Sequence, residues 1–216
     1  VPVWQGGDDN YSLFAVWSAS RTNTSQYVFS QSKFPVANGT RGSLILSSSG
    51  KYGFVGYNND ASSIAPYLVN EAHLTAMAVD NYADTNITVY DCGVYKGKTS
   101  VPGSLNVGTN ACQVGADGSG TVNLKGGIAE IVVFDHVLSD DERNRVGYYL
   151  QQKYGLSGGY TMPPESPIVE NDAGASGIGA QSATLNGELI SEGNATTCVR
   201  IYWGTSDGAT NPASWS

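Results

Sequence analysis

The amino-acid sequence predicts an all-β fold, and three observations support this prediction. Only 14% of the 216 residues are charged, which argues against a coiled coil or a helical bundle with a charged surface. The chain contains 27 Gly and 13 Tyr but only 2 Met, a composition typical of short strands joined by many turns. Short apolar or alternating runs also follow one another at the spacing expected of an antiparallel β-sandwich.

The strand series covers most of the first 134 residues. We expect strands at residues 12–18, 26–30, 43–47, 52–57, 74–80, 86–95, 111–115 and 127–134. Ser48, Ser49 and Gly50 suit a hairpin connection between the third and fourth strands, because Gly tolerates a positive φ. Residues 127–134 are apolar on both alternating faces, which predicts a strand covered on both sides in the centre of a sheet.

A single helix is predicted after this series. Ser139 and Glu142 have the spacing of a capping box, in which each side chain bonds the backbone amide of the other residue. Asp140 and Asp141 place negative charge at the positive end of the helix dipole. Apolar residues then recur at helical spacing, at Val146, Tyr149, Leu150 and Tyr154, and the helix is expected to end at Gly155.

The helix closes the first of three predicted parts. Residues 1–156 form the sandwich domain, and residues 157–167, rich in Gly and Pro, read as a linker. Residues 168–216 contain two further predicted strands, at 182–190 and 196–203. This last part is too short for an ordinary sandwich of about 100 residues, so we interpret it as a partial second β segment.

Residues 127–156 closely resemble the end of the laminin-G-like, concanavalin A-like lectin/glucanase domains of large bacterial surface and secreted proteins. The similar elements are the G-x-I-A-E strand, the L-S-x-x-E-R helix start and the Y-L-x-x-K-Y-G-L close. Residues 182–187 and 202–208 resemble the opening of a fibronectin type III-like repeat. The resemblance implies a two-sheet jelly roll that recognises carbohydrate or another surface partner, although one fold carries many functions.

Charge and hydropathy exclude two classes of partner. The chain carries 11 Lys and Arg against 19 Asp and Glu, a net charge of −8 that repels phosphate backbones and anionic lipid surfaces. Nucleic acid is therefore not expected as a partner. No run approaches the roughly 18 apolar residues that a membrane span needs, so no such span is expected.

No catalytic residues are expected. Glucanases of the resembled fold carry carboxylates at even spacing on one strand, because only such residues share a face and flank one glycosidic bond. That pattern is absent, and Glu130 and Asp135, five residues apart, would face opposite sides of a regular strand. We interpret Glu130 as a structural acid that bonds into the helix or a loop. A diverged glycosidase is the minor alternative.

The cysteines allow two interpretations. Cys92 and Cys112 could form a disulfide if their strands are neighbours, whereas Cys198 lies in the separate second segment. The alternative is that they are buried thiols, which pack as small apolar groups.

Calcium is a second open question, because sandwiches of the lectin type often carry it in loops. Asp60 and Asp117, in loops rich in Asn, Asp and Gly, are the candidate ligands. The same residue types are also what turns need for their own backbone hydrogen bonds, and no local spacing assembles the six to eight oxygens that calcium takes.

Sugar binding requires an exposed aromatic face that stacks on a pyranose, surrounded by amide and carboxylate groups. The residues that fit this description are Trp4, Tyr52, Tyr57, Asn58, Asn59 and Asp60. Trp17 alternates with Leu13 and Ala15 and is expected in the core.

The sequence therefore predicts a non-catalytic module of a larger extracellular or cell-surface protein, which recognises a glycan or an extracellular protein. The alternative is a structural subunit or spacer of an extracellular assembly. In that case neighbouring chains would complete its sheets, because unpaired strands invite strand addition and self-assembly.

Overall fold

A computed structural model describes residues 9–32, 40–58, 60, 61, 63–80, 85–101, 105–107, 112–171, 174–194, 196–204, 211 and 213. The chain divides into two compact units, Val1–Met162 and Pro163–Ser216. The division falls within the segment that the sequence predicts as a linker.

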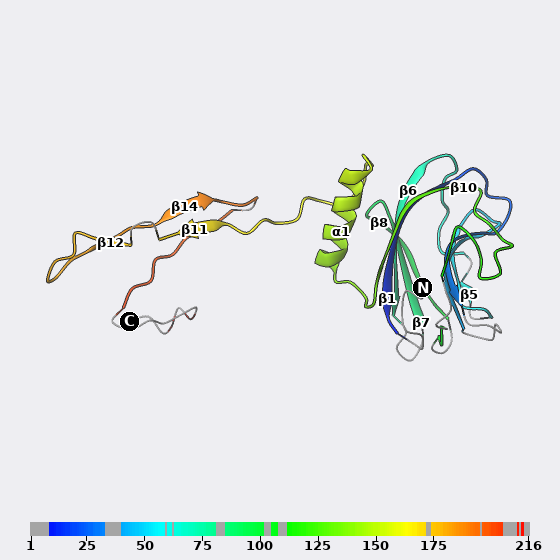
Figure 1. The fold of residues 1–216 in the computed structure, drawn as a ribbon, viewed down its shortest axis with the longest axis horizontal. Helices are drawn as coiled ribbons and strands as arrows, with labels where there is room; N and C mark the ends of the chain where they lie inside the picture. Colours follow the sequence, from blue (N-terminus) through cyan, green and yellow to red (C-terminus); the bar gives the residue numbers. More distant parts are fainter. Residues whose placement is uncertain are drawn as a thin grey trace. The chain divides into compact units, whose positions relative to one another are not determined.

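The first unit is a sandwich of two antiparallel sheets with five strands each, as the sequence predicts. The helix-side sheet has the order β10-β1-β6-β7-β8, and the distal sheet has the order β5-β4-β3-β2-β9. In Figure 1 the two sheets of this unit face each other, and the helix lies against the outer face of the helix-side sheet. The strands are β1 (Tyr11–Ala19), β2 (Gln26–Ser32), β3 (Arg41–Leu46), β4 (Tyr52–Val55), β5 (Asp60–Ala61), β6 (Ala72–Asp80), β7 (Thr85–Asp91), β8 (Val94–Val101), β9 (Gln113–Val114) and β10 (Gly126–Phe134).

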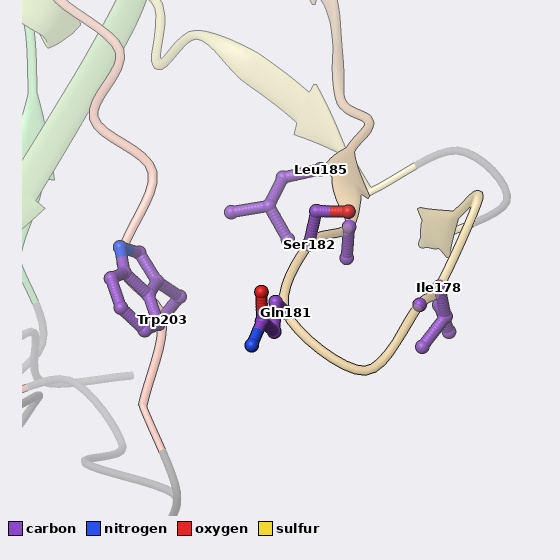
Figure 2. A pocket seen from close by; sticks show the side chains of 7 residues that line it. Ile178, Gln181, Ser182, Leu185 and Trp203 are labelled. Carbon is purple, nitrogen blue, oxygen red and sulfur yellow. The ribbon is translucent and has the colours of Figure 1, made fainter.

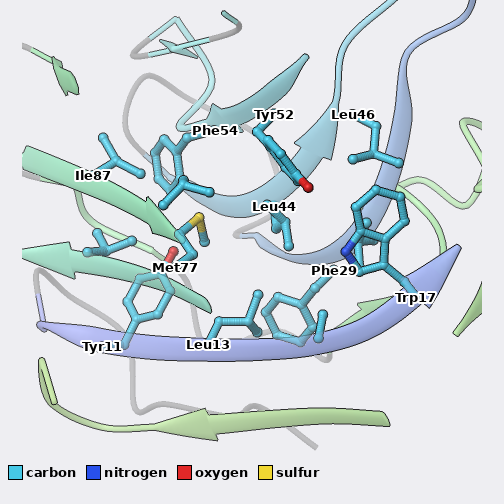
Figure 3. Close-up of a cluster of buried hydrophobic side chains, with 14 of the residues drawn as sticks. Tyr11, Leu13, Trp17, Phe29, Leu44, Leu46, Tyr52, Phe54, Met77 and Ile87 are labelled. Carbon is cyan, nitrogen blue, oxygen red and sulfur yellow. The ribbon is translucent and has the colours of Figure 1, made fainter. Parts of the chain in front are cut away.

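The main core lies between the two sheets. Trp17, Tyr52 and Phe54 are among its largest fully buried side chains, and Figure 3 shows them converging from β1 and β4. The expectation that Trp17 belongs to the core is confirmed. A second cluster lies between the helix-side sheet and the helix and includes Phe14, Leu74 and Leu150. The helix-side sheet is thus covered on both faces.

Residues 86–95 do not form one strand, as the sequence predicted, but belong to two strands joined by a tight turn. β7 ends at Asp91 and β8 begins at Val94. Between them Cys92 has a φ of 47° and Gly93 a φ of 77°, the left-handed pair that a two-residue hairpin requires. An alanine Cβ at Gly93 would lie 2.6 Å from the Tyr160 amide nitrogen, so this glycine also allows close backbone packing.

β10 is covered on both faces but lies at the edge of its sheet, not in the centre as predicted. Its pairing with β1 shifts register between Val16 and Trp17, which pair with Glu130 and Ile128 respectively. This bulge at Ala129 turns Ile128 to the same core as Ile131 and Val133. The predicted alternation separated Ile128 from those two residues because it assumed a regular strand.

The helix α1 (Asp140–Lys153) begins as predicted. The Ser139 hydroxyl accepts a hydrogen bond from the Glu142 amide, and the Glu142 carboxylate accepts one from the Ser139 amide. Val146, Leu150 and Tyr154 pack against the sheet, whereas Tyr149, predicted on the same stripe, is 58% exposed. The described residues include no helix that is both long and apolar enough to cross a membrane.

The first unit extends beyond Leu156, where the sequence predicted its end. The Gly159 amide donates a hydrogen bond to the Cys92 carbonyl at 2.7 Å, and Tyr160 is buried in the cluster under the helix. Residues 157–160 are therefore packed structure, although their composition resembles that of a linker.

The second unit contains two short ladders and no buried residue among those that the structure describes. One ladder pairs β11 (Ile168–Glu170) with β14 (Glu188–Ser191), and the other pairs β12 (Ala175–Ser176) with β13 (Thr184–Leu185). The predicted strand at 182–190 is thus split between β13 and β14. Residues 196–203, also predicted as a strand, are assigned to no strand and pair with none of the strands that the structure describes.

Candidate functional site

The predicted sugar-binding residues separate into three groups. Tyr57, Asn58 and Asp60 are exposed and lie together where β4 connects to β5. Tyr52 has an exposed fraction of 0% and is a core residue, so the prediction that it contacts a ligand is wrong. Trp4 and Asn59 lie outside the described residues.

The connection from β4 to β5 holds Tyr57 in a defined position. Tyr57 and Asn58 both adopt left-handed backbone conformations, with φ values of 60° and 59°. The Asp60 carboxylate closes the turn by accepting a hydrogen bond from the Gly56 amide at 3.0 Å. A tyrosine in the left-handed region is uncommon and strained, and such residues cluster at functional sites. The ring that this turn presents is 39% exposed.

Arg41, which was not among the predicted site residues, packs against this ring and holds it in place. Its guanidinium carbon lies 5.8 Å from the centre of the Tyr57 ring and 5.7 Å from the centre of the Tyr27 ring. Nη1 of Arg41 donates a hydrogen bond to the Tyr27 hydroxyl at 3.2 Å. Arg41 is 8% exposed, so these two cation–π contacts are largely shielded from water. Tyr57, Arg41 and Tyr27 form one stack, which we call the Tyr57 stack.

Asp117 lies in a loop whose own residues donate three hydrogen bonds to its carboxylate. Oδ1 accepts from the Thr121 amide at 2.8 Å and from the Val122 amide at 2.9 Å, and Oδ2 accepts from the Ser119 hydroxyl at 2.6 Å. Burial favours the neutral acid, but these donors outweigh it and lower the pKa of Asp117 to about 2. The carboxylate organises its own turn.

The candidate calcium ligands do not form a fitting donor set. Asp60 and Asp117 are both bound by backbone amides, and the described part of the chain contains no group of three acidic, His or Cys side chains able to hold a metal. A hard cation needs six to eight oxygens. The local geometry therefore matches the turn interpretation of these residues.

Comparison with known proteins identifies the fold. No protein-family model matches the sequence, and no curated protein matches it either. Among solved structures, the sialidase of Trypanosoma rangeli matches with a TM-score of 0.50 at 14% identity, over 68% of this chain and 23% of that chain. The SAP-like pentraxin of Limulus polyphemus has a TM-score of 0.48 at 14% identity, over 62% of this chain and 69% of that chain. The CBM40 of the Ruminococcus gnavus IT-sialidase, bound to sialyllactose, has a TM-score of 0.45 at 15% identity, over 66% of this chain and 92% of that chain.

The first unit is a two-sheet antiparallel β-sandwich of the jelly-roll kind. At these identities the similarity concerns the fold and not the ligand. The site must therefore be argued from the side chains of this chain.

A cavity of about 360 Å³ in this sandwich is lined by His73, Asp91 and Cys92, residue types used in thiol catalysis. Their geometry does not suit that chemistry. Nδ1 of His73 lies 2.9 Å from Asp91 Oδ2, and Nε2 lies 2.8 Å from the Leu68 carbonyl oxygen, so neither nitrogen is available to the thiol. Burial also raises the pKa of the Cys92 thiol.

Cys92 and Cys112 do not form the predicted disulfide. Cys92 packs in the cluster under the helix, whereas Cys112 packs against the core between the sheets. The helix-side sheet separates those two clusters, so the sulfurs belong to opposite faces. Both are packed thiols, as the alternative interpretation expects, but they are partly and not fully buried.

Glu130 has the structural role that the sequence predicted. Its Oε2 accepts hydrogen bonds from Lys153 Nζ and from the Tyr154 hydroxyl, each at 2.9 Å. The bonds from Lys153 and then Tyr154 lower the pKa of this carboxyl. Glu130 therefore ties β10 to the end of α1.

The second unit has an open cavity of about 450 Å³ that includes Gln181, Ser182, Leu185 and Trp203 in its lining. In Figure 2 the Trp203 ring faces Gln181 and Leu185 across this space. Trp203 is 70% exposed, so the cavity is a shallow surface feature with little shielding from water.

Proposed function

We propose that the sandwich is a carbohydrate-recognition module of the laminin-G-like kind and that the turn containing Tyr57 contacts the sugar. The observation that carries the proposal is the Tyr57 stack: an exposed aromatic ring supported by a buried guanidinium. Asn58 and Asp60 lie in the same turn and supply polar groups beside the ring.

The physical basis is preorganisation. An aromatic ring offers a large, rigid apolar face to the C–H groups of a pyranose and loses little conformational entropy on binding. The left-handed backbone at Tyr57 and the contact with Arg41 hold the ring before the ligand arrives. Amide and carboxylate groups at the edge of the ring then select among hydroxyl configurations.

This module is non-catalytic in our proposal, and it acts outside the cell as part of a larger protein that contains a fibronectin type III-like segment. Glu130 is engaged by Lys153 and Tyr154, and no second carboxylate of the described residues pairs with it. The CBM40 among the similar structures binds a sugar, but the proposal rests on the Tyr57 stack and not on that similarity.

The test is a glycan array probed with the purified 216-residue chain, followed by titration of the best glycan. Tyr57→Ala should weaken glycan binding by about tenfold or more, because it removes the aromatic ring that stacks on the sugar and is held in place before binding. Tyr149→Ala, at another exposed tyrosine on α1, is the matched control and should bind as the unmodified chain does. An array without any bound glycan, obtained with a folded chain, would refute the proposal.

A second function is supported by the second unit. Its described residues include exposed Ile168, Ile178, Ile201 and Trp203 and no buried side chain. In this alternative the chain is a structural subunit whose strands are completed by a neighbouring chain, because uncovered apolar strands favour strand addition. Light scattering after size-exclusion chromatography tests it: a strictly monomeric, well-folded chain would exclude self-assembly.

A further inference from the structure

Arg41 is a buried cation that has no carboxylate partner within hydrogen-bonding distance among the described residues. Its exposed fraction is 8%, and none of the ion pairs formed by the described residues includes it. Burying a charge without an opposite charge is costly, and such groups are normally paired. Its surroundings therefore point to an anion from outside the described residues.

The hydrogen-bonding pattern of Arg41 shows which edge of the guanidinium is available. Nη1 bonds the Tyr27 hydroxyl, and this is the one hydrogen bond of the side chain within the described residues. Nε is buried and has no acceptor. Nε and Nη2 together form the edge that binds an oxyanion side-on, through two parallel N–H···O bonds.

Gly118 packs closely beside this edge, where a larger residue would not fit. A Cβ atom at residue 118 would lie 3.7 Å from Nη2 of Arg41 and would also collide with the Ser32 hydroxyl. The neighbouring Asp117 does not supply the missing anion, because its two oxygens accept bonds from Ser119, Thr121 and Val122. Asp60 is likewise turned to the Gly56 amide and makes no ion pair with Arg41.

We propose that the saccharide recognised at the Tyr57 stack is acidic, and that Nε and Nη2 of Arg41 bind its oxyanion, either a carboxylate or a sulfate ester. This inference rests on the proposed carbohydrate recognition. In this proposal the sugar ring stacks on Tyr57, and its anionic substituent enters at the edge of that ring to reach the guanidinium packed against it. The acidic group gives Arg41 the partner that the described residues do not provide.

The experiment uses an array that contains neutral, carboxylated and sulfated glycans of matched length, probed with the 216-residue chain. The best carboxylated glycan is then titrated beside its methyl ester, and the best sulfated glycan beside its desulfated form. The acidic forms should bind about tenfold to a hundredfold more tightly than their neutral counterparts, the range expected for hydrogen bonds to a charged group. The carboxylate and sulfate pairs distinguish the two sources of the anion.

Variants test Arg41 itself. Arg41→Lys keeps the charge but lacks the planar fork, so it should reduce the preference for the acidic form by about tenfold. The comparison of a glycan with its methyl ester needs no variant and remains decisive if Arg41→Lys fails to fold. Selective binding of neutral glycans would overturn this inference while leaving carbohydrate recognition intact, whereas no glycan binding at all would overturn both.

Discussion

His73 and Asp91 form a buried pair in which the histidine ring is placed between two acceptors. Nδ1 faces the Asp91 carboxylate at 2.9 Å and Nε2 faces the Leu68 carbonyl at 2.8 Å. Only the imidazolium carries a proton on both nitrogens, so this geometry selects the charged form. Trp17 stacks on the ring with 4.5 Å between centroids and shields the pair from water.

The first prediction concerns pH. Burial lowers the pKa of His73, but the bonds to Asp91 and Leu68 outweigh it, and the net shift is upward. The folded state therefore binds the proton more tightly than the unfolded chain, whose histidine pKa is about 6.5. The stabilisation is fully present below that value and is lost as the pH rises through the folded pKa. Urea unfolding between pH 5.5 and 9 should show this decline.

Two variants test this prediction, one at the buried pair and one at an exposed histidine that serves as the control. Asp91→Ala should cost about 3–5 kcal/mol of unfolding free energy at pH 6, because it leaves a buried cation unpaired, and should flatten the pH dependence. His136→Gln alters an exposed histidine and should retain the dependence of the unmodified chain. An Asp91→Ala profile parallel to that of the unmodified chain would contradict the assignment.

Tyr52 provides a second prediction, which separates stability from binding. Its hydroxyl lies 3.2 Å from Nδ1 of His73, and the ring is fully buried. Tyr52→Phe should lower the free energy of unfolding by about 1 kcal/mol through the lost hydrogen bond. Glycan affinity should stay unchanged, since the ring contacts the core and not the surface. A loss of glycan affinity with an unchanged free energy of unfolding would show that Tyr52 contacts the ligand.

The capping box gives a third prediction. Ser139→Ala removes the acceptor of the Glu142 amide and should cost about 1 kcal/mol in chemical unfolding. Ser139→Asp keeps a side-chain acceptor at the same position and should recover most of that loss. Equal stability of the two variants would show that the hydroxyl does not cap the helix.

The fourth prediction concerns calcium. Because the Asp117 oxygens are already bound by Ser119, Thr121 and Val122, we expect EDTA to leave the thermal unfolding midpoint unchanged. Adding millimolar calcium should also leave it unchanged, since a ligand stabilises only the state that binds it. Asp117→Ala should destabilise the chain equally with and without calcium. A calcium-dependent midpoint would contradict this expectation and assign the Asp117 carboxylate to a calcium site.

The parts of the fold that depend on local spacing could be predicted from the sequence. The capping box at Ser139 needs only four consecutive residues, and its geometry is as predicted. The hairpin at Cys92 and Gly93 was missed because Cys rarely adopts a positive φ, although Gly93 itself is a turn signal. The β10 bulge depends on pairing with β1, which no single strand encodes.

The site was only partly predictable for a similar reason. Tyr52 shares a strand face with the apolar Phe54, two residues away, and that alternation indicated the core. Tyr57 and Asp60 belong to a turn with a clear polar composition. Arg41 was missed because its significance comes from Tyr27, which lies on β2, and from Tyr57, which lies in the turn after β4. Contacts between distant residues are not visible in sequence spacing.

The bond between Gly159 and Cys92 also has a mechanical consequence. Chain tension that arrives from Pro163 first meets Thr161, whose backbone is hydrogen-bonded to Asn144 of α1, and then the buried Tyr160 and the bond between Gly159 and Cys92. The hairpin of β7 and β8 thus transfers part of this force to the helix-side sheet. Stretching of single molecules should therefore release Thr161 from Asn144 first and then residues 157–160, and the helix should detach only at a higher force.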